Sequence, residues 1–475
     1  MTLPAAAAVH ADVHADISDV TAEHELVITD PATGESVGSL TPAGAAECAS
    51  AVAAAHAAFP GWAATAPAVR GELLRAAAAA LAAQADELAA LNTRETGKTA
   101  GDAAGGVQAA VGTLLQYAEL GPLHRGKALR GDRLAVDYAL PHPRGVVVAL
   151  TPWNDPVAVA AGLVGAAIVS GNTVVHKASE RCPHTGALLN EILAGALPDG
   201  VLVSVTGGGA TGAALAEDDR VAVIAHVGST ATGRQLALVG AATGAHVIRE
   251  NGGNDALIVD AGVDPVWAAG QAALGAFANT GQICTSVERI YVHRAVAEPF
   301  LAALTAEAQA WTERLGPLVD ERMRRAVHDQ VGQAVAAGAT LHTGGAVPTG
   351  PGIFYPATVL TDVPDNAIVM AEETFGPVAP VRVVDDFDTA LALAAADRYG
   401  LAASVLTTDM AHAHRAAAVL PVGTIKVNGV FGGAPGGSAQ PRGASGAGFG
   451  YGPELLNEMT TTTVVHLGLP GGAGA

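Results

Sequence analysis

The stretch ANTGQICTSVER, from Ala278 to Arg289, places Cys284 among small polar residues in a glycine-containing turn. A cysteine thiolate attacks carbonyl carbons, but it needs a base for its proton and donors for the oxyanion that forms. No histidine lies within this stretch. Because a free cysteine is more often a small buried hydrophobe, the catalytic interpretation requires partners from elsewhere in the chain.

Two upstream segments offer a base and an oxyanion donor. In IRENGGND, Glu250 stands at the end of a predicted strand, just before Gly252 and Gly253, which permit close approach of the backbone. In TPWNDP, the side-chain amide of Asn154 can donate to a developing oxyanion. Each segment also has a plainer interpretation, a solvated glutamate at a strand end and an Asx turn before Pro156.

A segment that follows another predicted strand is suited to an anion. HVGSTATG opens a helix, so Gly228, Ser229 and Thr230 are expected to offer backbone N–H groups and a hydroxyl to a pyrophosphate. The spacing from Gly228 to Gly233 differs from the G-x-G-x-x-G fingerprint. Taken alone, such a segment is more often a capped turn than a nucleotide site.

Alternating strands and helices must position these residues. From about Gly145, short β-branched runs alternate with alanine-rich helical stretches, and a second series follows Cys284. This pattern predicts right-handed crossovers, parallel sheets and two α/β units in one chain. Residues 128–145 and the β-branched run from Met459 to Leu469 fit neither unit. Because isolated strands are unstable, we expect these two segments to pair and to extend a sheet across a subunit interface.

Composition restricts the partners. Of the 475 residues, 50% are hydrophobic. The chain has 25 basic and 45 acidic residues, which gives a formal net charge of −20. Such a surface repels nucleic acid and anionic lipid. The purely apolar run from Val157 to Val169 is shorter than the ~20 residues that a membrane span needs, and no basic region precedes apolar residues at the N-terminus. Three cysteines without short-range pairing favour a reducing cytoplasm.

Four ordered motifs carry a resemblance to a known family. GQIC with Cys284, ENGG with Glu250, PWN with Asn154 and EETFGP with Glu373 are similar to elements of the aldehyde dehydrogenase superfamily. Cys284 and Glu250 are 34 residues apart (284 − 250), which resembles the family's usual spacing. The resemblance covers nearly the whole chain, from DPATGESVG at Asp30 to TTTTVVHL.

The resemblance implies NAD(P)-dependent, hydrolytic oxidation of an aldehyde to a carboxylic acid. Cys284 would form a thiohemiacetal and then a thioester, Asn154 would hold the oxyanion, and Glu250 would activate the hydrolytic water. Lys177 and Glu180 would contact the adenosine ribose, and Glu373 would hold the nicotinamide ribose. The full set of expected cofactor contacts is Trp153, Lys177, Glu180, Gly228, Ser229, Thr230, Gly233, Glu373 and Phe375.

The resemblance also implies the fold and the assembly. We expect an α/β fold with a Rossmann-like cofactor-binding domain, a second α/β catalytic domain and a small β oligomerisation element. The predicted limits are 1–127 with 146–254, then 255–447, and 128–145 with 456–469. We expect a homodimer or homotetramer, no metal ion, and NAD as the cofactor with NADP as the alternative. NAD is favoured because Glu180 would repel the extra phosphate of NADP, although Lys177 would attract it.

Several residues depart from the family pattern. Leu163 stands where a lysine commonly aids proton traffic, and Asn251 replaces a leucine. Asp155 stands where an aromatic residue is usual, and with Thr285 and Ser286 it is expected to line the substrate tunnel. An ionised carboxylate there favours cationic or strongly polar aldehydes, whereas the alternative is that Asp155 only caps the following helix. Two other functions stay open: a CoA-acylating dehydrogenase, and a catalytically impaired family member that acts as a binding protein.

Overall fold

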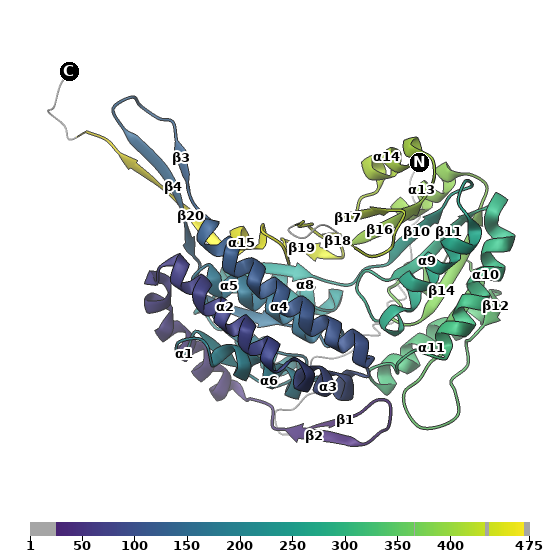
Figure 1. The fold of residues 1–475 in the computed structure, drawn as a ribbon, viewed down its shortest axis with the longest axis horizontal. Coiled ribbons are helices and arrows are strands. Elements are labelled where there is room, and N and C mark those ends of the chain that lie inside the picture. Colours follow the sequence, from purple (N-terminus) through teal and green to yellow (C-terminus); the bar gives the residue numbers. More distant parts are fainter. Residues whose placement is uncertain (1–24, 365, 433–436, 470–475) are drawn as a thin grey trace.

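The computed structural model describes residues 25–364, 366–432 and 437–469. Figure 1 shows two α/β lobes side by side and an arm of β-strands that projects from one of them. The sequence expectation about a secretory signal concerns the first residues of the chain, which lie outside the described part. Within the described residues, the lobes contain one sheet of six strands and one of seven.

The first sheet has the order β19-β9-β8-β5-β6-β7. All neighbours in it are parallel except β19 and β9. The chain runs from β5 outward through β6 and β7, and then returns to β8 on the other side of β5. The carboxyl ends of β5 and β8 therefore form a topological switch point, where α/β sheets bind ligands. The strands are β5 (Val146–Leu150), β6 (Thr173–Lys177), β7 (Leu202–Ser204), β8 (Val221–Val227), β9 (His246–Glu250) and β19 (Gly446–Ala447).

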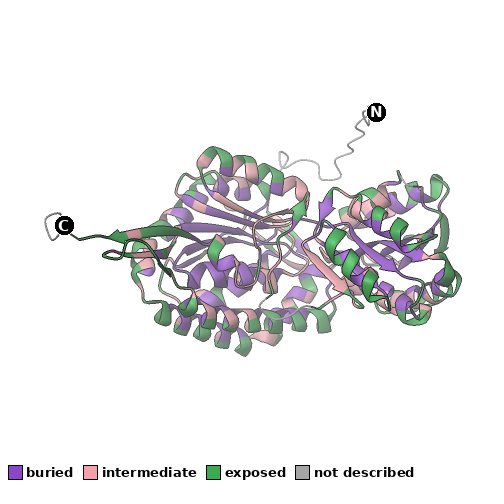
Figure 2. Ribbon diagram, turned by 90° about the horizontal axis from the view of Figure 1, so that it is seen from above, coloured by how far each residue is buried: buried purple, intermediate pink, exposed green. Residues whose placement is uncertain are grey.

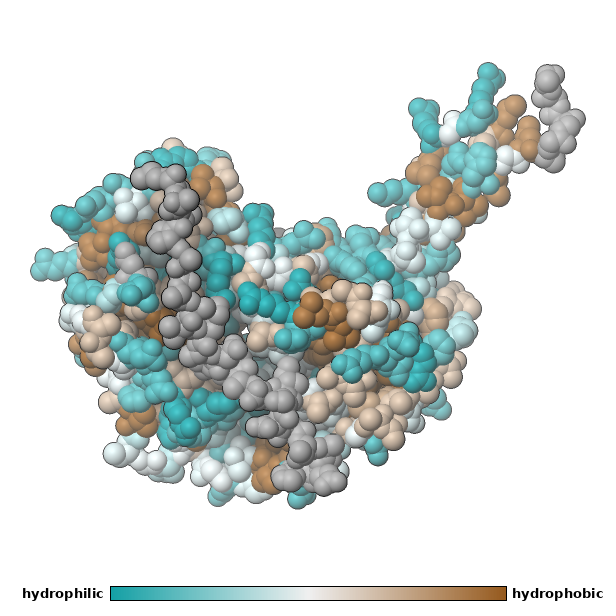
Figure 3. Space-filling view, turned by 180° about the vertical axis from the view of Figure 1, so that it is seen from behind, coloured by the Kyte–Doolittle hydropathy of each residue, from teal (hydrophilic) through white to brown (hydrophobic). Residues whose placement is uncertain are grey.

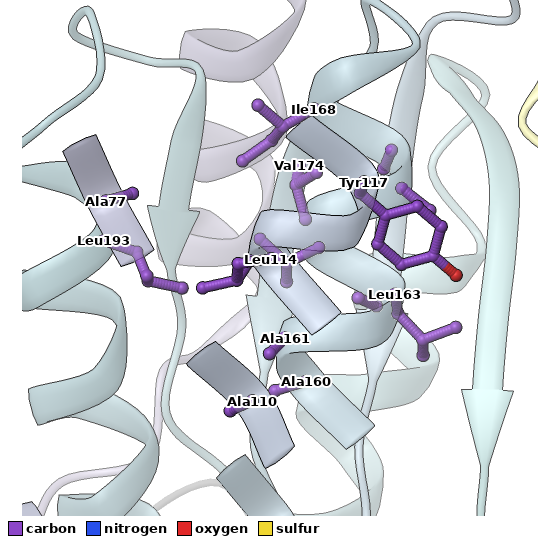
Figure 4. Close-up of a cluster of buried hydrophobic side chains, with 14 of the residues drawn as sticks. Ala77, Ala110, Leu114, Tyr117, Ala160, Ala161, Leu163, Ile168, Val174 and Leu193 are labelled. Carbon is purple, nitrogen blue, oxygen red and sulfur yellow. The ribbon is translucent and has the colours of Figure 1, made fainter. Parts of the chain in front are cut away.

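Helices cover both faces of this sheet, so its central strand β5 is wholly buried. Val147 and Ala149 of β5 face one apolar cluster, and Val146, Val148 and Leu150 face the other. The helices packed against the first face are α2 (Pro67–Ala83), α3 (Ala85–Thr96), α4 (Ala100–Leu123), α5 (Pro156–Val169) and α6 (Pro183–Ala194). Those on the opposite face are α1 (Ala45–Ala64), α7 (Gly209–Ala216) and α8 (Thr230–Thr243). Figure 4 shows the close packing of α4 and α5 in the first cluster.

The second sheet has the order β12-β13-β14-β11-β10-β16-β17. It is parallel apart from the pairing of β12 with β13. Its strands are β10 (Asp255–Val259), β11 (Val287–His293), β12 (Thr340–Thr343), β13 (Thr358–Thr361), β14 (Val378–Val384), β16 (Ala402–Leu406) and β17 (Thr424–Val427). The buried strands lie between outward-facing helices in Figure 2.

The helices of the second lobe again lie on two faces. The cluster on one face includes α9 (Pro265–Phe277) and α10 (Arg294–Thr312), and the other includes α13 (Phe387–Ala395) and α14 (Met410–Val419). Helices α11 (Glu321–Ala336) and α12 (Ile368–Ala371) pack around a smaller cluster. The remaining short elements are β1 (Leu26–Thr29), β2 (Ser36–Leu40), β15 (Tyr399–Gly400), β18 (Arg442–Gly443) and α15 (Leu455–Glu458).

The projecting arm is formed by the two segments that fitted neither α/β unit. Strand β20 (Thr460–Leu467) pairs antiparallel with β4 (Val136–Pro143), which also pairs with β3 (Lys127–Leu129). The predicted pairing of these segments is therefore confirmed. Apolar side chains of the arm remain exposed, among them Leu134, Val136 and Val464. Brown patches on the arm in Figure 3 reflect this composition.

Candidate active site

The junction between the two sheets brings the cysteine to the paired glycines. Glu250 ends β9 in the first sheet, and the chain passes through Gly252 and Gly253 into β10 of the second. Strand β11 lies parallel to β10 with Val287 opposite Asp255, so Cys284 and Gly253 precede paired strands at the same edge. A methyl group on Gly253 would lie 2.6 Å from the carbonyl oxygen of Cys284. Only glycine permits this approach.

The loop that carries Cys284 has an unusual backbone. Asn279 and Thr280 adopt left-handed conformations with φ of 49° and 59°, and Gly281 follows with φ of 72°. A methyl group on Gly281 would lie 2.1 Å from the carbonyl oxygen of Gly376, in the EETFGP motif. Strained backbone of this kind needs surrounding contacts to hold it. The glycine of GQIC is therefore required for the contact between two of the motifs.

Hydrogen bonds fix Asn154 and the cysteine loop to one another. The Asn154 side-chain amide donates to the carbonyl oxygen of Gln282 at 3.0 Å, and the Asn279 amide donates to the same oxygen at 3.1 Å. Gln282 is itself buried, and its side-chain oxygen accepts from Val319 N–H at 3.0 Å. The Asn154 amide is thus bonded to the residue that stands two positions before Cys284, which brings its N–H groups close to the turn that carries the sulfur.

Glu250 is held in a confined position. Its backbone carbonyl accepts from Gly228 N–H at 3.0 Å, which connects it to the segment that opens α8. A methyl group on Gly450 would lie 2.4 Å from the carboxyl carbon of Glu250, so the C-terminal segment covers this side chain closely. Burial raises the pKa of Glu250 from 4.5 to about 7. A carboxyl with a pKa near neutrality is suited to general base catalysis.

The sulfur of Cys284 lies in an acidic environment. The residue is free and half-buried. Burial raises the pKa of the Cys284 thiol, and the charges of Glu250, Asp255, Glu373 and Asp155 act in the same direction. The resting residue is therefore a neutral thiol, and attack on a carbonyl requires a base to remove the proton.

The EETFGP motif lies against the paired glycines. A carboxylate oxygen of Glu373 accepts from Gly253 N–H at 3.1 Å, and burial followed by the charge of Glu288 raises its pKa. Phe375 has a positive φ of 53°, and its N–H donates to Glu288 at 3.1 Å. The rings of Phe375 and Trp153 meet edge to face at 5.6 Å. Trp153 and Phe375, both expected to contact the cofactor, thus meet although they belong to different lobes.

Lys177 and Glu180 lie at the end of β6. The buried ammonium of Lys177 donates to the carbonyl oxygens of Ala178 and Gly207 at 3.0 and 2.9 Å. Burial opposes ionisation of Glu180, but the charges of Lys177, Arg181 and Arg322 bring its pKa below the ordinary value. Glu180 is therefore a carboxylate at neutral pH.

The start of α8 differs in detail from the sequence expectation. Gly228 N–H is already used by Glu250, the Ser229 hydroxyl accepts from Thr232 N–H at 3.2 Å, and the Thr230 hydroxyl donates to Ala444. The Gly228 N–H and the two hydroxyls thus serve as a cap and as ties within the protein, and donation by the Ser229 and Thr230 N–H groups to an anion stays a prediction. The other N–H groups of the first turn have no intrahelical partner, so the helix end still suits an anion. Gly233 lies against the Asn251 side chain.

The three residues expected in the substrate tunnel have different environments. Asp155 is the N-cap residue of α5, but its side chain makes no capping hydrogen bond. It forms an ion pair with Lys98 at 2.9 Å instead, so the interpretation of Asp155 as an Asx cap is wrong. Thr285 is half-buried. Ser286 is buried and donates its hydroxyl to Gly281 at 3.1 Å, which puts it inside the loop instead of on an open wall.

Comparisons with known proteins agree with this geometry. The family model described as "Aldehyde dehydrogenase family" matches residues 19–465. The chain belongs to the aldehyde dehydrogenase family. It is 36% identical to betaine aldehyde dehydrogenase 1 of Rhizobium meliloti (strain 1021) over 465 residues, 92% of this chain and 93% of that protein.

Solved structures give the same result. Lactaldehyde dehydrogenase from Escherichia coli superposes with a TM-score of 0.91 at 30% identity, covering 94% of this chain and 96% of that one. An NAD-dependent aldehyde dehydrogenase from Sinorhizobium meliloti has a TM-score of 0.91 at 31% identity, with 95% and 92% covered. The expected α/β fold is confirmed, and the protein is an NAD(P)-dependent oxidoreductase that acts on aldehydes.

Leu163 shows how this aldehyde dehydrogenase departs from the expected pattern. It is buried in the cluster that also contains Leu114 and Tyr117, and Figure 4 labels all three side chains in this cluster. An apolar residue at this position therefore completes the core. The Tyr117 hydroxyl donates to the carbonyl oxygen of Gly452 at 3.1 Å.

Two residues of this site were missed by sequence reasoning: Lys98 and Gly450. They lie far from the motifs along the chain, and no local pattern marks them.

Two further properties concern the described residues as a group. No helix among them is long and apolar enough to cross a membrane. Across the same residues, no three or more His, Cys, Asp or Glu side chains come together in a way that could hold a metal ion.

Proposed function

We propose that Cys284 is the nucleophile, Glu250 the general base and Asn154 the oxyanion donor of a hydrolytic aldehyde dehydrogenase. The observation that carries this proposal is the contact of the Cys284 loop with two other segments, the glycines that follow Glu250 and the Asn154 amide. The parallel register of β10 and β11 puts Cys284 beside the glycines that follow Glu250, and the Asn154 amide is bonded to the cysteine loop.

The resting thiol is neutral, so the first step needs a proton acceptor. Glu250, with a pKa of about 7, is the carboxylate suited to take the Cys284 proton as sulfur bonds to the aldehyde carbon. The oxygen of the resulting thiohemiacetal accepts hydrogen bonds from the Asn154 amide and from the Cys284 N–H. When bound, NAD or NADP supplies the hydride acceptor that the oxidation needs. Loss of hydride from the carbon leaves a thioester on Cys284.

Hydrolysis of the thioester completes the cycle. Once Glu250 has released the Cys284 proton to solvent, it takes a proton from water, the oxygen of that water bonds to the acyl carbon, and the carbon–sulfur bond breaks as this proton passes to sulfur. The carboxylic acid leaves and the Cys284 thiol is restored. A base at this position favours water over a thiol acceptor, so the CoA-acylating alternative is the weaker one.

A panel of aldehydes, assayed for NADH with and without CoA, tests the reaction class. We expect turnover that does not depend on CoA, no turnover by Cys284→Ala, and retained cofactor binding by that variant. Strict dependence on CoA would support the acylating alternative. Absence of NADH formation by the wild-type protein with every aldehyde, together with normal cofactor binding, would support the binding-protein alternative.

We propose a polar substrate entrance formed by Asp155, Lys98 and Gly106. The ion pair offsets the charge of Asp155, and Gly106 packs directly against the pair, since a methyl group there would lie 2.9 Å from Oδ1 of Asp155. None of these three residues is aromatic, whereas aromatic faces commonly hold quaternary ammonium groups. We therefore favour polar, hydrogen-bonding aldehydes over strongly cationic ones, which revises the expectation from the sequence alone.

The substrate proposal is tested by replacing the ion pair with two apolar side chains that still fill the space. The double variant Lys98→Met with Asp155→Phe should shift kcat/KM from a hydroxyaldehyde such as lactaldehyde toward hexanal. Betaine aldehyde serves as the cationic probe. An unchanged ranking of the three aldehydes would contradict the placement of Asp155 at the entrance.

We propose that NAD is preferred over NADP. The support is the ionised carboxylate of Glu180, which disfavours a second anion nearby. Lys177, Arg181 and Arg322 oppose this effect, since their charges reach Glu180. Glu180→Gln should raise kcat/KM for NADP relative to NAD, and Arg322→Gln should lower it. A wild-type enzyme with the higher kcat/KM for NADP would refute the preference.

We propose that the arm joins copies of this chain as a homodimer or homotetramer. We also propose the domain limits expected from the sequence, except that β19 at the end of 255–447 belongs with the first sheet. The support is the exposure of Leu134, Val136 and Val464 on strands that extend away from the lobes. Val464→Asp should lower the mass measured by light scattering. A mass that stays the same would count against the arm as the interface.

A further inference from the structure

The side chains of Thr424 and Lys426 lie on one face of β17, at the edge of the second sheet. Lys426 is opposite Ser404 of β16, and Ser404 is opposite Leu257 of β10. Side chains in register on neighbouring parallel strands point to the same face, and side chains two residues apart along a strand do so as well. Thr424 and Lys426 therefore share the face of Leu257, which carries the apolar cluster with α9 and α10.

The loop after β17 packs beside the start of β11, just after the loop that carries the cysteine. A methyl group on Gly275 of α9 would lie 2.5 Å from Cγ2 of Val287 and 3.2 Å from Cβ of Val430. Both valines therefore rest against the same point of the helix. Val287 follows Cys284 by three residues, and Val430 directly precedes Phe431. The segment with Phe431 is thereby brought to the end of the Cys284 loop.

Electrostatic interactions connect this face of β17 with the cysteine. Burial raises the pKa of Tyr451, a hydrogen bond with the Thr424 side chain opposes this shift, and the charge of Cys284 adds to it. Burial lowers the pKa of Lys426, and the charges of Asp255 and Cys284 oppose this shift. Interactions between charges weaken with distance and are screened by solvent. The Lys426 ammonium therefore lies near the sulfur of Cys284.

The Lys426 ammonium has no bonded partner in the described part of the chain. It makes no hydrogen bond and no ion pair there, and the centroid of the Phe431 ring lies 5.6 Å from Nζ. Two other lysines that are removed from solvent are both bonded: Lys98 pairs with Asp155, and Lys177 donates to two carbonyl oxygens. A partly desolvated cation without a partner is costly. Because Lys426 is only half-buried, a ligand can reach it.

Asp255 does not supply the missing partner. One oxygen of its carboxyl group accepts from Ala402 N–H at 3.0 Å. The other is buried and has no hydrogen-bond partner within the described residues. Burial raises the pKa of Asp255 well above its ordinary value, so this carboxyl resists ionisation. The space beside Cys284 therefore contains a cation, Lys426, to which no carboxylate of the described chain is bonded.

We propose that the Lys426 ammonium binds a carboxylate at the far end of the substrate, so that aldehydic acids are the preferred substrates of this enzyme. The proposal rests on Cys284 as the nucleophile and names the substrate class for that site. With the aldehyde carbon at the sulfur, a short aliphatic spacer lies along the Phe431 ring and brings the carboxylate to the ammonium. A charge-assisted hydrogen bond then supplies the partner that the protein leaves out. A cationic aldehyde is repelled at the same point.

Calorimetric titration of Cys284→Ala with succinic semialdehyde and with butanal tests this assignment without a catalytic readout. The two aldehydes have the same number of carbons and differ in the carboxylate, and NAD is present throughout. Succinic semialdehyde should bind more tightly. Adding Lys426→Met should weaken its binding at least about tenfold, the loss expected for a hydrogen bond between charged groups, and leave butanal unaffected. Adding Lys426→Arg should keep most of the affinity. The melting temperature of Lys426→Met should be maintained or raised, because an unpaired cation is removed.

The matched control is Arg415→Met. Arg415 of α14 also lies over an aromatic ring, with its guanidinium carbon 5.6 Å from the centroid of Phe387, but it pairs with Asp388. Its loss changes the net charge by the same amount and should leave the affinity for succinic semialdehyde unchanged.

Three outcomes would overturn the proposal: equal affinity of Cys284→Ala for the two aldehydes, an equal loss for both on adding Lys426→Met, or an equal loss of succinic semialdehyde affinity on adding Arg415→Met. Because binding to Cys284→Ala involves no reaction, this result is separate from the fate of the proposed chemistry.

Discussion

Changing Glu250 to Gln should remove a titration near pH 7 from the rate of acyl release. With a pKa of about 7, Glu250 is a carboxylate in roughly 9% of molecules at pH 6 and about 91% at pH 8. At the ordinary pKa of 4.5 it would already be ~97% ionised at pH 6. The base form is the deprotonated one, so wild-type kcat should rise about tenfold from pH 6 to pH 8 if hydrolysis limits turnover.

Stopped-flow measurement of NADH separates the two chemical steps. Glu250→Gln should still give a burst of NADH close to one equivalent, formed more slowly because the Cys284 thiol has lost its base, followed by turnover reduced at least ~100-fold. Its residual rate should lack the inflection near pH 7. Loss of the burst amplitude would mean that no group other than Glu250 can accept the Cys284 proton, and a wild-type profile without an inflection between pH 6 and 8 would refute the argument from burial.

Glu288 supplies a matched control for this profile. Burial raises its pKa to about 7 as well, but its carboxylate accepts from the N–H groups of Thr374 and Phe375 and does not meet the reacting groups. Glu288→Gln should keep the inflection near pH 7 even where the KM for cofactor rises. An inflection that disappears in this variant and persists in Glu250→Gln would reassign the titration.

Three other changes test the packing around the site. Gly450→Ala should reduce kcat strongly, because the added methyl overlaps the Glu250 carboxyl, and an unchanged kcat in steady-state assays would show that the C-terminal segment moves freely. Leu163→Lys should lower the free energy of unfolding by about 3 to 5 kcal/mol in urea titration, since it buries an unpaired charge in an apolar cluster. A decrease of less than about 1 kcal/mol would mean that the ammonium reaches a polar partner. Lys98→Met should raise the KM for a hydroxyaldehyde and leave cofactor affinity unchanged, and equal effects on both ligands would place Lys98 in a purely structural role.

The sequence by itself determined the fold class and the chemical groups. Local patterns sufficed for this, because the period of two in strands, the apolar helical stretches and the glycines that permit close approach are written into short segments. The order of Asn154, Glu250, Cys284 and the EETFGP motif was enough to indicate the family. The pairing of residues 128–145 with the C-terminal strand also followed, because lone strands must find partners.

Only the tertiary structure decided which groups meet and what each is bonded to. Asp155 pairs with Lys98, and Gly450 covers Glu250. These contacts join segments separated by tens to hundreds of residues, and their identity depends on strand register and helix orientation. The pKa of Glu250 likewise comes from burial, which is a property of the packed chain and not of the residue type. The sequence determines which donors and acids are available to the site. Three-dimensional packing determines which groups they contact and how their pKa values shift.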